Sequence, residues 1–464
     1  MTVKKIILSL FFVLCALSVL VADSSSENSE NTEEKTQFEE RREKISYGLD
    51  SEIEELITEI VKDEDFEYGD DLFALFDSTR NQKLKTKIFD YFIAARDFHL
   101  TGFALEVLND PMDQKKAIVN KVFEYVSALE IREAKDSVMR LLFEEDGTYV
   151  EAAAKTIGKI GAQEDTEKLA EMLDSAVPEN VRLLLISALG DLNASKSVDT
   201  IMALAKDTSE STSVRMAAAE ALGGIDSPET TDALVSIYED TDSNVRVSVV
   251  KALAKKNNEN SKKIIITAVK DSFYKVRLAA LQAIIDQNIE DASSVVLYRA
   301  KNDAENVVKH KAYETLSAIH SAEGIWYLLN VIEDKKKSET DRAKAAAVLL
   351  KYNFETSIEP VKSVARETLD DKRLIKLRYA IGKELARYSN PAIEDICAAY
   401  MINDDVATKG TALDMFEKNN FASLRPLVEV MSVDVKEGTN MRKAKNVLDR
   451  IERAGIPLTE SSND

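Results

Sequence analysis

One short pattern recurs about every 31 to 36 residues between Lys85 and Lys409, and this repeat limits the chain to a small set of folds. Three clear copies are 180–190 (NVRLLLISALG), 213–223 (SVRMAAAEALG) and 244–253 (NVRVSVVKAL). A fixed period in this range is typical of a solenoid, in which each repeat buries its apolar side only against its neighbours. Proline and glycine are scarce, with 7 and 14 residues among 464, which favours an all-helical array.

Residues 229–258 illustrate how one repeat is built. From Glu229 to Glu239, apolar residues recur at the spacing of a single helical face. The polar segment 240–244 (DTDSN) then breaks the helix, because its short side chains compete for backbone hydrogen bonds. A second helix starts at Val245 and runs past the apolar residue Leu253. We therefore expect each repeat to be an antiparallel pair of helices.

The Val-Arg pair after an acidic turn resembles the HEAT repeat. The Ala-Leu-Gly ending at 188–190 and 221–223 resembles the HEAT-like repeats found in phycobilisome lyase proteins. In that family, an aspartate of the turn and the arginine of the second helix form a ladder between repeats. The resemblance implies such a ladder here, incomplete because Val150 takes the arginine position in one repeat. The residues that it assigns to the ladder are Asp240, Arg246, Asp271, Arg277, Arg182 and Arg215.

Alignment on the arginine position predicts an all-α fold, a right-handed α-solenoid of about eleven antiparallel helix pairs with helical caps. We expect an N-terminal helical cap over 45–80, the HEAT-like solenoid over 81–435, and a C-terminal capping helix and tail over 436–464. Terminal repeats need a polar outer side for solubility, which explains the caps. The aligned positions are Lys85, Lys115, Val150, Arg182, Arg215, Arg246, Arg277, Lys309, Arg342, Arg378 and Lys409.

The first 44 residues have a different composition. Lys4 and Lys5 precede an uncharged, largely apolar run that ends at Ala22, as in a secretory signal peptide. We therefore predict a signal peptide over 1–22 and localisation in the periplasm or cell envelope. A secreted protein, and one anchored by an uncleaved N-terminal helix, are the alternatives. Residues 23–44 are polar and charged, and we expect a disordered acidic linker there.

Charge and cysteine content exclude some classes of partner. The formal net charge is −21, so the chain lacks the basic stripe that nucleic-acid binding requires. A membrane contact is expected only through the N-terminal segment, whereas a protein partner fits the acidic surface. Cys397 is the sole cysteine once residues 1–22 are removed, so no internal disulfide is expected, and its apolar neighbours indicate a buried thiol.

The sequence offers no constellation typical of catalysis. Three histidines, His99, His310 and His320, lack the spacing of metal ligands, and no phosphate-binding or nucleophile motif is present. We therefore predict no enzyme activity, no catalytic residue, no cofactor and no metal. Trp326 and Tyr327 form a conspicuous aromatic pair, which either packs inside the stack or exposes an aromatic side chain to a partner.

The solvent-facing places of the second helices carry side chains of mixed charge, which suits protein recognition better than a phosphate, sugar or metal. The first hypothesis is thus an exported, non-enzymatic scaffold that binds a protein partner through a concave surface of second helices. A lyase-like or chaperone-like modifier of a partner protein, and a purely structural spacer in the cell envelope, are the alternatives. The candidate partner-binding residues are Lys251, Gln282, Glu314, Trp326 and Lys383.

Overall fold

A computed structural model describes residues 37–144, 147–173, 177–240 and 242–459. The predicted signal peptide and the linker up to residue 36 lie outside this part of the chain. In the described residues the secondary structure is helical, apart from an isolated bridge between Phe421 and Thr459. None of the helices described is both long and apolar enough to cross a membrane. The predicted all-α solenoid is confirmed.

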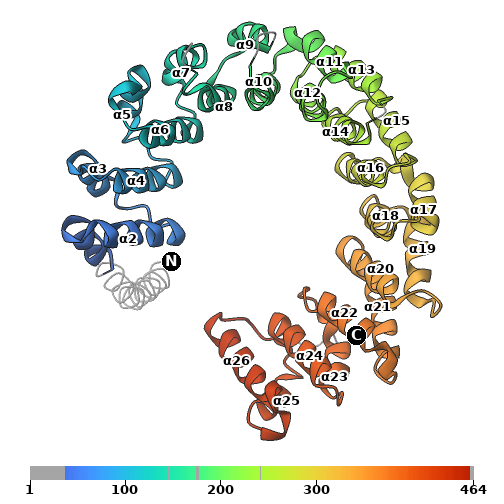
Figure 1. Ribbon diagram of the computed structural model, residues 1–464. Coiled ribbons are helices and arrows are strands. Elements are labelled where there is room, and N and C mark those ends of the chain that lie inside the picture. Colours follow the sequence, from blue (N-terminus) through green and yellow to red (C-terminus); the bar gives the residue numbers. More distant parts are fainter. Residues whose placement is uncertain (1–36, 145–146, 174–176, 241, 460–464) are drawn as a thin grey trace, which may run out of the picture. The chain divides into compact units, whose positions relative to one another are not determined.

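The chain divides into two compact units, residues 1–200 and 201–464. In the first unit, each odd-numbered helix pairs with the even-numbered helix that follows it (Figure 1). The helices of this unit are α2 (Asp50–Asp63), α3 (Gly69–Ser78), α4 (Gln82–Ala94), α5 (Thr101–Asn109), α6 (Lys116–Leu129), α7 (Lys135–Leu142), α8 (Val150–Ile160), α9 (Thr166–Leu173) and α10 (Glu179–Asp191).

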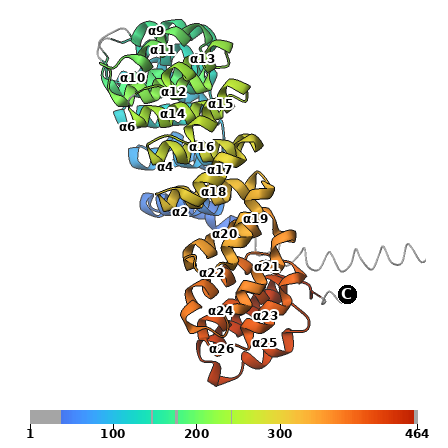
Figure 2. The ribbon, with the colours of Figure 1, turned by 90° about the vertical axis from the view of Figure 1, so that its right-hand side faces the viewer.

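The second unit continues the same pattern, and Figure 2 shows its second helices stacked in order from α12 to α26. Its helices are α11 (Val198–Lys206, which begins before the division), α12 (Thr212–Gly224), α13 (Pro228–Ile237), α14 (Ser243–Ala254), α15 (Glu259–Ala268), α16 (Tyr274–Gln287), α17 (Ser293–Asn302), α18 (Asn306–Ala318), α19 (Ala322–Glu333), α20 (Glu339–Tyr352), α21 (Phe354–Glu367), α22 (Ile375–Leu385), α23 (Glu394–Met401), α24 (Val406–Asn419), α25 (Arg425–Met431) and α26 (Thr439–Arg453).

The repeat α13–α14 shows why the sequence folds in this way. Asp242 caps α14, because its carboxylate accepts the backbone N–H of Asn244 at 2.8 Å. The apolar residues of α14 follow the helical period, so Val245, Val249 and Leu253 are all fully buried. The polar side of the helix remains exposed. Each repeat therefore has one apolar face, and only a neighbouring repeat can cover it.

The aligned arginine positions fall at the starts of the even-numbered helices α4 to α24, as the repeat spacing predicts. The predicted domain boundaries differ from the structure in two places. A boundary at 81 separates α3 from α4, and one at 435 separates α25 from α26, although each of these pairs packs together. The repeat signal lies in the second helix, so an alignment on it does not locate the first helix of a terminal pair.

The linker prediction for 23–44 is wrong in its last part, because residues 37–47 are helical. Tertiary contacts stabilise this helix. Arg41 donates hydrogen bonds to Asp63 at 2.6 Å and to Asp65 at 2.5 Å, and Phe38 stacks on Tyr68 with ring centroids 5.3 Å apart. Composition alone therefore misjudges the segment, since its ordering depends on residues more than 20 positions away.

Candidate binding surfaces

Buried ion pairs join consecutive repeats of the second unit. Arg246 forms a bidentate pair with Asp271 at 2.8 and 2.9 Å, and Arg277 forms one with Asp303 at 2.9 and 2.8 Å. Arg215 also pairs with the next aspartate, Asp240, through one guanidinium nitrogen. Each arginine thus reaches forward to the turn of the following repeat. We call these three pairs the arginine–aspartate ladder.

Each ladder aspartate also organises its own turn. Asp271 accepts the backbone N–H of Phe273 at 2.8 Å, and Asp303 accepts that of Glu305 at 3.0 Å. Burial alone would raise the pKa of Asp271, but the hydrogen bonds from Arg246 and Phe273 hold that pKa below its usual value. The carboxylate is therefore charged and fully engaged. This chemistry holds repeats together and leaves no group available for a ligand.

Among the described residues, other repeats also show contacts with their own turn at the arginine position. Arg182 donates to the carbonyl of Leu173 at 3.1 Å, and Arg378 donates to the carbonyls of Thr368 and Leu369, both at 3.0 Å. Lys309 takes the arginine position in α18 and lies 3.4 Å from the side chain of Asn306. These residues therefore brace the turn of their own repeat.

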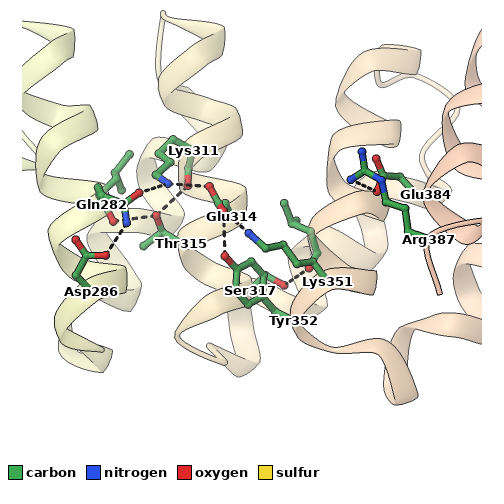
Figure 3. Close-up of polar contacts among 12 residues, drawn as sticks. Gln282, Asp286, Lys311, Glu314, Thr315, Ser317, Lys351, Tyr352, Glu384 and Arg387 are labelled. Atoms are coloured by element: carbon green, nitrogen blue, oxygen red, sulfur yellow. Dashed lines mark hydrogen bonds and ion pairs between the residues drawn. The ribbon is translucent and has the colours of Figure 1, made fainter. Parts of the chain in front are cut away.

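The solvent-facing sides of the even-numbered helices, the second helix of each pair, form what we call the second-helix surface. In the second unit, polar contacts cross this surface from one helix to the next (Figure 3). Lys311 of α18 donates to Gln282 of α16 at 2.6 Å and to Glu314 at 2.7 Å. Lys351 and Tyr352 of α20 donate to the same Glu314 at 3.0 and 2.9 Å. Of the predicted partner-binding residues, Gln282 and Glu314 are thus linked through Lys311.

The remaining candidates of this group lie apart from that cluster. Lys251 is exposed on α14, and Lys383 of α22 has its ammonium 4.5 Å from the ring centre of Tyr379. Trp326 belongs to α19, a first helix, so it lies on the other row of helices. Its side chain is 68% exposed, so of the two alternatives predicted for Trp326, exposure to a partner and packing inside the stack, the structure shows the exposed one.

Glu314 is the most strongly perturbed acid of the second-helix surface. Burial would raise its pKa, but the hydrogen bonds from Lys311, Lys351 and Tyr352 lower it to about 2. The pKa of Lys351 is raised by its bonds to Tyr352 and Glu314. The carboxylate of Glu314 is therefore shared by two lysines in a link between α18 and α20, and a partner would compete with these bonds.

A groove of about 540 Å³ lies on the second-helix surface of the first unit, between α4, α6 and α8. Ile93, Phe123 and Ala152 supply apolar lining, while Lys116 and Lys155 are exposed at its margin. Nothing in the repeat pattern pointed to this groove. The lining side chains come from three consecutive second helices, so the period within one repeat carries no signal for the groove.

The chemically reactive side chains of the described residues are placed for structure. Cys397 is fully buried beside the carbonyl of Ala412, and burial raises the pKa of its thiol, which disfavours the reactive thiolate. His310 contacts Asp341 at 2.8 Å, and His320 contacts Asn353 at 2.9 Å. Within the described ranges, no group of three or more histidine, cysteine, aspartate or glutamate side chains is arranged to hold a metal ion.

The family of the chain follows from its repeats. A family model described as Spirochaete HEAT repeat protein matches residues 45–447, which is most of the chain. The protein therefore belongs to this HEAT-repeat family. The match begins at the first residue of the predicted N-terminal cap and ends inside α26, so both end repeats are included in it. No curated protein matches the chain.

Several solved structures are similar to this chain at low identity. The karyopherin Kap121p, bound to the extreme C-terminus of the protein phosphatase Cdc14p, is 11% identical with a TM-score of 0.45, over 89% of this chain and 53% of that one. Kap121p bound to Nup53p is 12% identical with a TM-score of 0.45, again over 89% of this chain and 53% of that one. The complex of CpcE and CpcF of phycocyanin lyase from Nostoc sp. PCC7120 is 16% identical with a TM-score of 0.34, over 55% of this chain and 94% of that chain. The chain spans about half the length of the karyopherin.

Proposed function

We propose that this protein is an exported, non-enzymatic scaffold that binds a protein partner through its second-helix surface. The groove between α4, α6 and α8 carries the proposal. Its apolar lining, from Ile93, Phe123 and Ala152, lies inside a polar margin, which is the composition of a protein interface. A partner could bury apolar side chains there while its polar groups remain at the rim.

The charges at the rim favour an acidic partner segment. Glu124 accepts from Lys121 at 2.5 Å and is paired with a base, whereas Glu151 accepts from the neutral amide of Asn180 at 3.0 Å and keeps its charge. Lys116 and Lys155 are exposed on α6 and α8. Opposite charge on the partner would steer its approach and fix its orientation, while burial in the groove would supply the affinity.

A site-specific cross-linker tests the proposal in the full-length chain. A photoreactive residue at Lys155, beside the groove, should give a discrete adduct with one partner protein in intact cells. The same residue at Lys168, exposed on α9, is the matched control and should not give that adduct. Ala152→Arg fills the groove and should abolish the adduct without changing the circular dichroism spectrum. Absence of any adduct at Lys155 would support a mechanical spacer instead.

Export is tested separately, by fractionating cells and sequencing the N-terminus of the mature protein. We expect the chain in the envelope fraction, with its first residue near Asp23, since the apolar run ends at Ala22. A cytoplasmic chain that still begins at Met1 would contradict export. It would leave the groove and its partner unaffected, because the two experiments have independent readouts.

A further inference from the structure

A second groove of the first unit lies between the helix pair α7–α8 and the helix pair α9–α10. Its volume is about 740 Å³, and apolar side chains supply much of its lining. Phe143 follows the end of α7 and is 47% exposed there, while Met172 and Val177 are partly exposed. The groove therefore leaves apolar surface that a partner can cover. The other apolar lining residues are Leu142, Val150, Pro178 and Val181.

Hydrogen bonds between the helices hold the walls of this groove in place. Asn180 at the start of α10 donates to Glu151 of α8 at 3.0 Å. Arg182 of α10 donates to the carbonyl of Leu173 at the end of α9, at 3.1 Å. Arg140 of α7 donates to two backbone carbonyls at the end of α5, at 2.9 and 2.8 Å. The groove is thus already formed, so a ligand does not have to order its walls.

The charged side chains that line the groove are all acidic, and they are Glu144, Glu151 and Glu171. Arg140 pairs with Glu144, which balances one of these charges. Glu151 accepts from a neutral amide, and in the described part of the chain no base is paired with the exposed Glu171. We call this site the acidic groove.

The surroundings of the acidic groove have the same sign of charge. Residues 135–191, which contain its four helices, have twelve acidic side chains and six basic ones. Lys155 and Lys168 lie one helical turn from Glu151 and Glu171, but neither lysine lines the groove. Lys159 is paired with Asp191 at 3.0 Å, outside the groove. The lining therefore favours a cationic ligand.

We propose that the acidic groove binds a basic segment of a partner protein in which a large apolar side chain lies between lysine or arginine residues. The apolar side chain packs against Phe143, Met172 and Val177, which supplies affinity by removing apolar surface from water. The flanking cations approach Glu151 and Glu171, which orients the segment. The same carboxylates disfavour nucleic acids and anionic lipids.

This proposal does not rest on the groove between α4, α6 and α8. Thr148 and Glu151 border both grooves, but Lys155 lines only the first, whereas Phe143 and Glu171 line only the acidic groove. The two sites therefore select segments of opposite charge. A basic peptide tests the acidic groove, and the cross-link at Lys155 tests the other one, so either proposal can fail alone.

Labelled synthetic peptides test the chemistry of the ligand, with fluorescence anisotropy of the full-length protein at about 0.15 M salt, where long-range attraction is screened. A peptide that repeats Lys-Leu-Ser should bind. One that repeats Lys-Ser-Ser keeps the charge without the apolar side chain, and should bind roughly tenfold more weakly or worse. One that repeats Glu-Leu-Ser reverses the charge and should also bind at least roughly tenfold more weakly.

Variants test the residues of the acidic groove, with the Lys-Leu-Ser peptide as the probe. Glu171→Lys should weaken binding by roughly tenfold, whereas Asp199→Lys makes the same change of charge at an exposed site on α11 and should have little effect. Phe143→Ala should also weaken binding by roughly tenfold, and Phe98→Ala, at a phenylalanine that is 57% exposed outside the groove, should not.

Three results would overturn the proposal. The first is no binding of Lys-Leu-Ser at millimolar concentration. The second is equal binding of Lys-Leu-Ser and Lys-Ser-Ser, which would show attraction of any polycation to an acidic protein. The third is unchanged binding by Glu171→Lys when circular dichroism shows that its helical content is intact.

Discussion

At the residue scale, burial determines which charged groups stabilise the chain. The side chain of Asp303 is fully buried and accepts two hydrogen bonds from Arg277, which offset most of its desolvation, and Arg299 lies 3.6 Å away as a second cation. Most other ion pairs of the described residues are at least partly exposed to water and contribute little. An exposed example is Lys196 with Glu167, whose side chains are 77% and 62% exposed. Ion pairs of the same formal charge therefore contribute very different amounts to the free energy of unfolding, according to their burial.

Removing one member of the ladder should be costly. Asp303→Ala leaves Arg277 buried without its partner, so we expect a loss of about 3–5 kcal/mol in the free energy of unfolding, measured by urea denaturation. Arg277→Met with Asp303→Ala should lose less than the single variant, because the buried guanidinium of Arg277 is no longer left without its carboxylate. Glu167→Ala, at an exposed pair, should leave the free energy of unfolding nearly unchanged. A double variant that is less stable than Asp303→Ala alone would contradict this account.

Glu314 should make stability depend on pH in the acid range. Its pKa is lowered to about 2 in the folded chain, so the carboxylate stabilises the fold above its unfolded pKa and this stabilisation is lost as pH falls from about 5 towards 2. Glu314→Gln cannot titrate. Between pH 7 and pH 3 the natural protein should therefore lose roughly 1–2 kcal/mol more unfolding free energy than the variant does. Parallel curves for the two proteins would show that the Lys311–Glu314–Lys351 link is energetically neutral.

At the scale of helices, close approach of second helices explains the Ala-Leu-Gly ending. Gly223 lies inside α12, and a Cβ atom added there would come 2.8 Å from the Cα and Cβ of Ala252 in α14. Gly158 of α8 faces Ala188 of α10 in the same way, with a distance of 3.2 Å. Gly158 lies inside α8, whereas Gly161 follows the end of that helix. The glycine therefore permits helix packing.

A pair of glycine substitutions separates packing from helix propensity. Gly223→Ala should destabilise the chain by about 1–3 kcal/mol, because overpacking against Ala252 outweighs the better propensity of alanine. Gly102→Ala in α5 has nothing within 4 Å of its new methyl group, and should stabilise by about 0.5 kcal/mol. Thermal unfolding of both variants would measure this difference. If both substitutions stabilise the protein, the α12–α14 contact is looser than described.

At the scale of the whole molecule, stability is distributed along the chain, since each repeat contacts mainly the repeats beside it. The C-terminal helix α26 covers α24 through polar contacts that include Asn440 with the carbonyl of Val406 at 3.0 Å and Lys443 with the carbonyl of Gly410 at 2.7 Å. Its other side is polar, with Arg442 and Lys445 exposed. The last helix thus ends the stack without leaving an apolar face.

Deleting residues 439–464 should therefore have a local effect. Amide hydrogen exchange should accelerate in α24 and then in α22, whereas α4 to α8 in the first unit should keep their protection, because coupling decays from repeat to repeat. Lys445→Ala, which removes an exposed side chain of α26 and no packing, serves as the control and should change nothing. Uniform loss of protection across both units would indicate a single cooperative fold instead.

The sequence by itself determined the repeat and the pairing of helices. These depend on local physics: apolar residues at the helical period mark a buried face, and short polar residues cap and end helices. No further information was required to predict the class of fold, because a stack of similar units brings only neighbouring units into contact. The same locality explains why the signal was clear in second helices and weak at the terminal pairs.

Only the tertiary structure decided which groups meet. Arg246 reaches Asp271 in the next repeat, and the helix over 37–47 depends on contacts with Asp63, Asp65 and Tyr68. Trp326 is exposed while Tyr327 packs beside Tyr313, although both are aromatic neighbours in sequence. Successive helical residues point about 100° apart, so the orientation of α19 against its neighbours decides which ring faces water. That orientation is a property of packing, and residue type alone does not encode it.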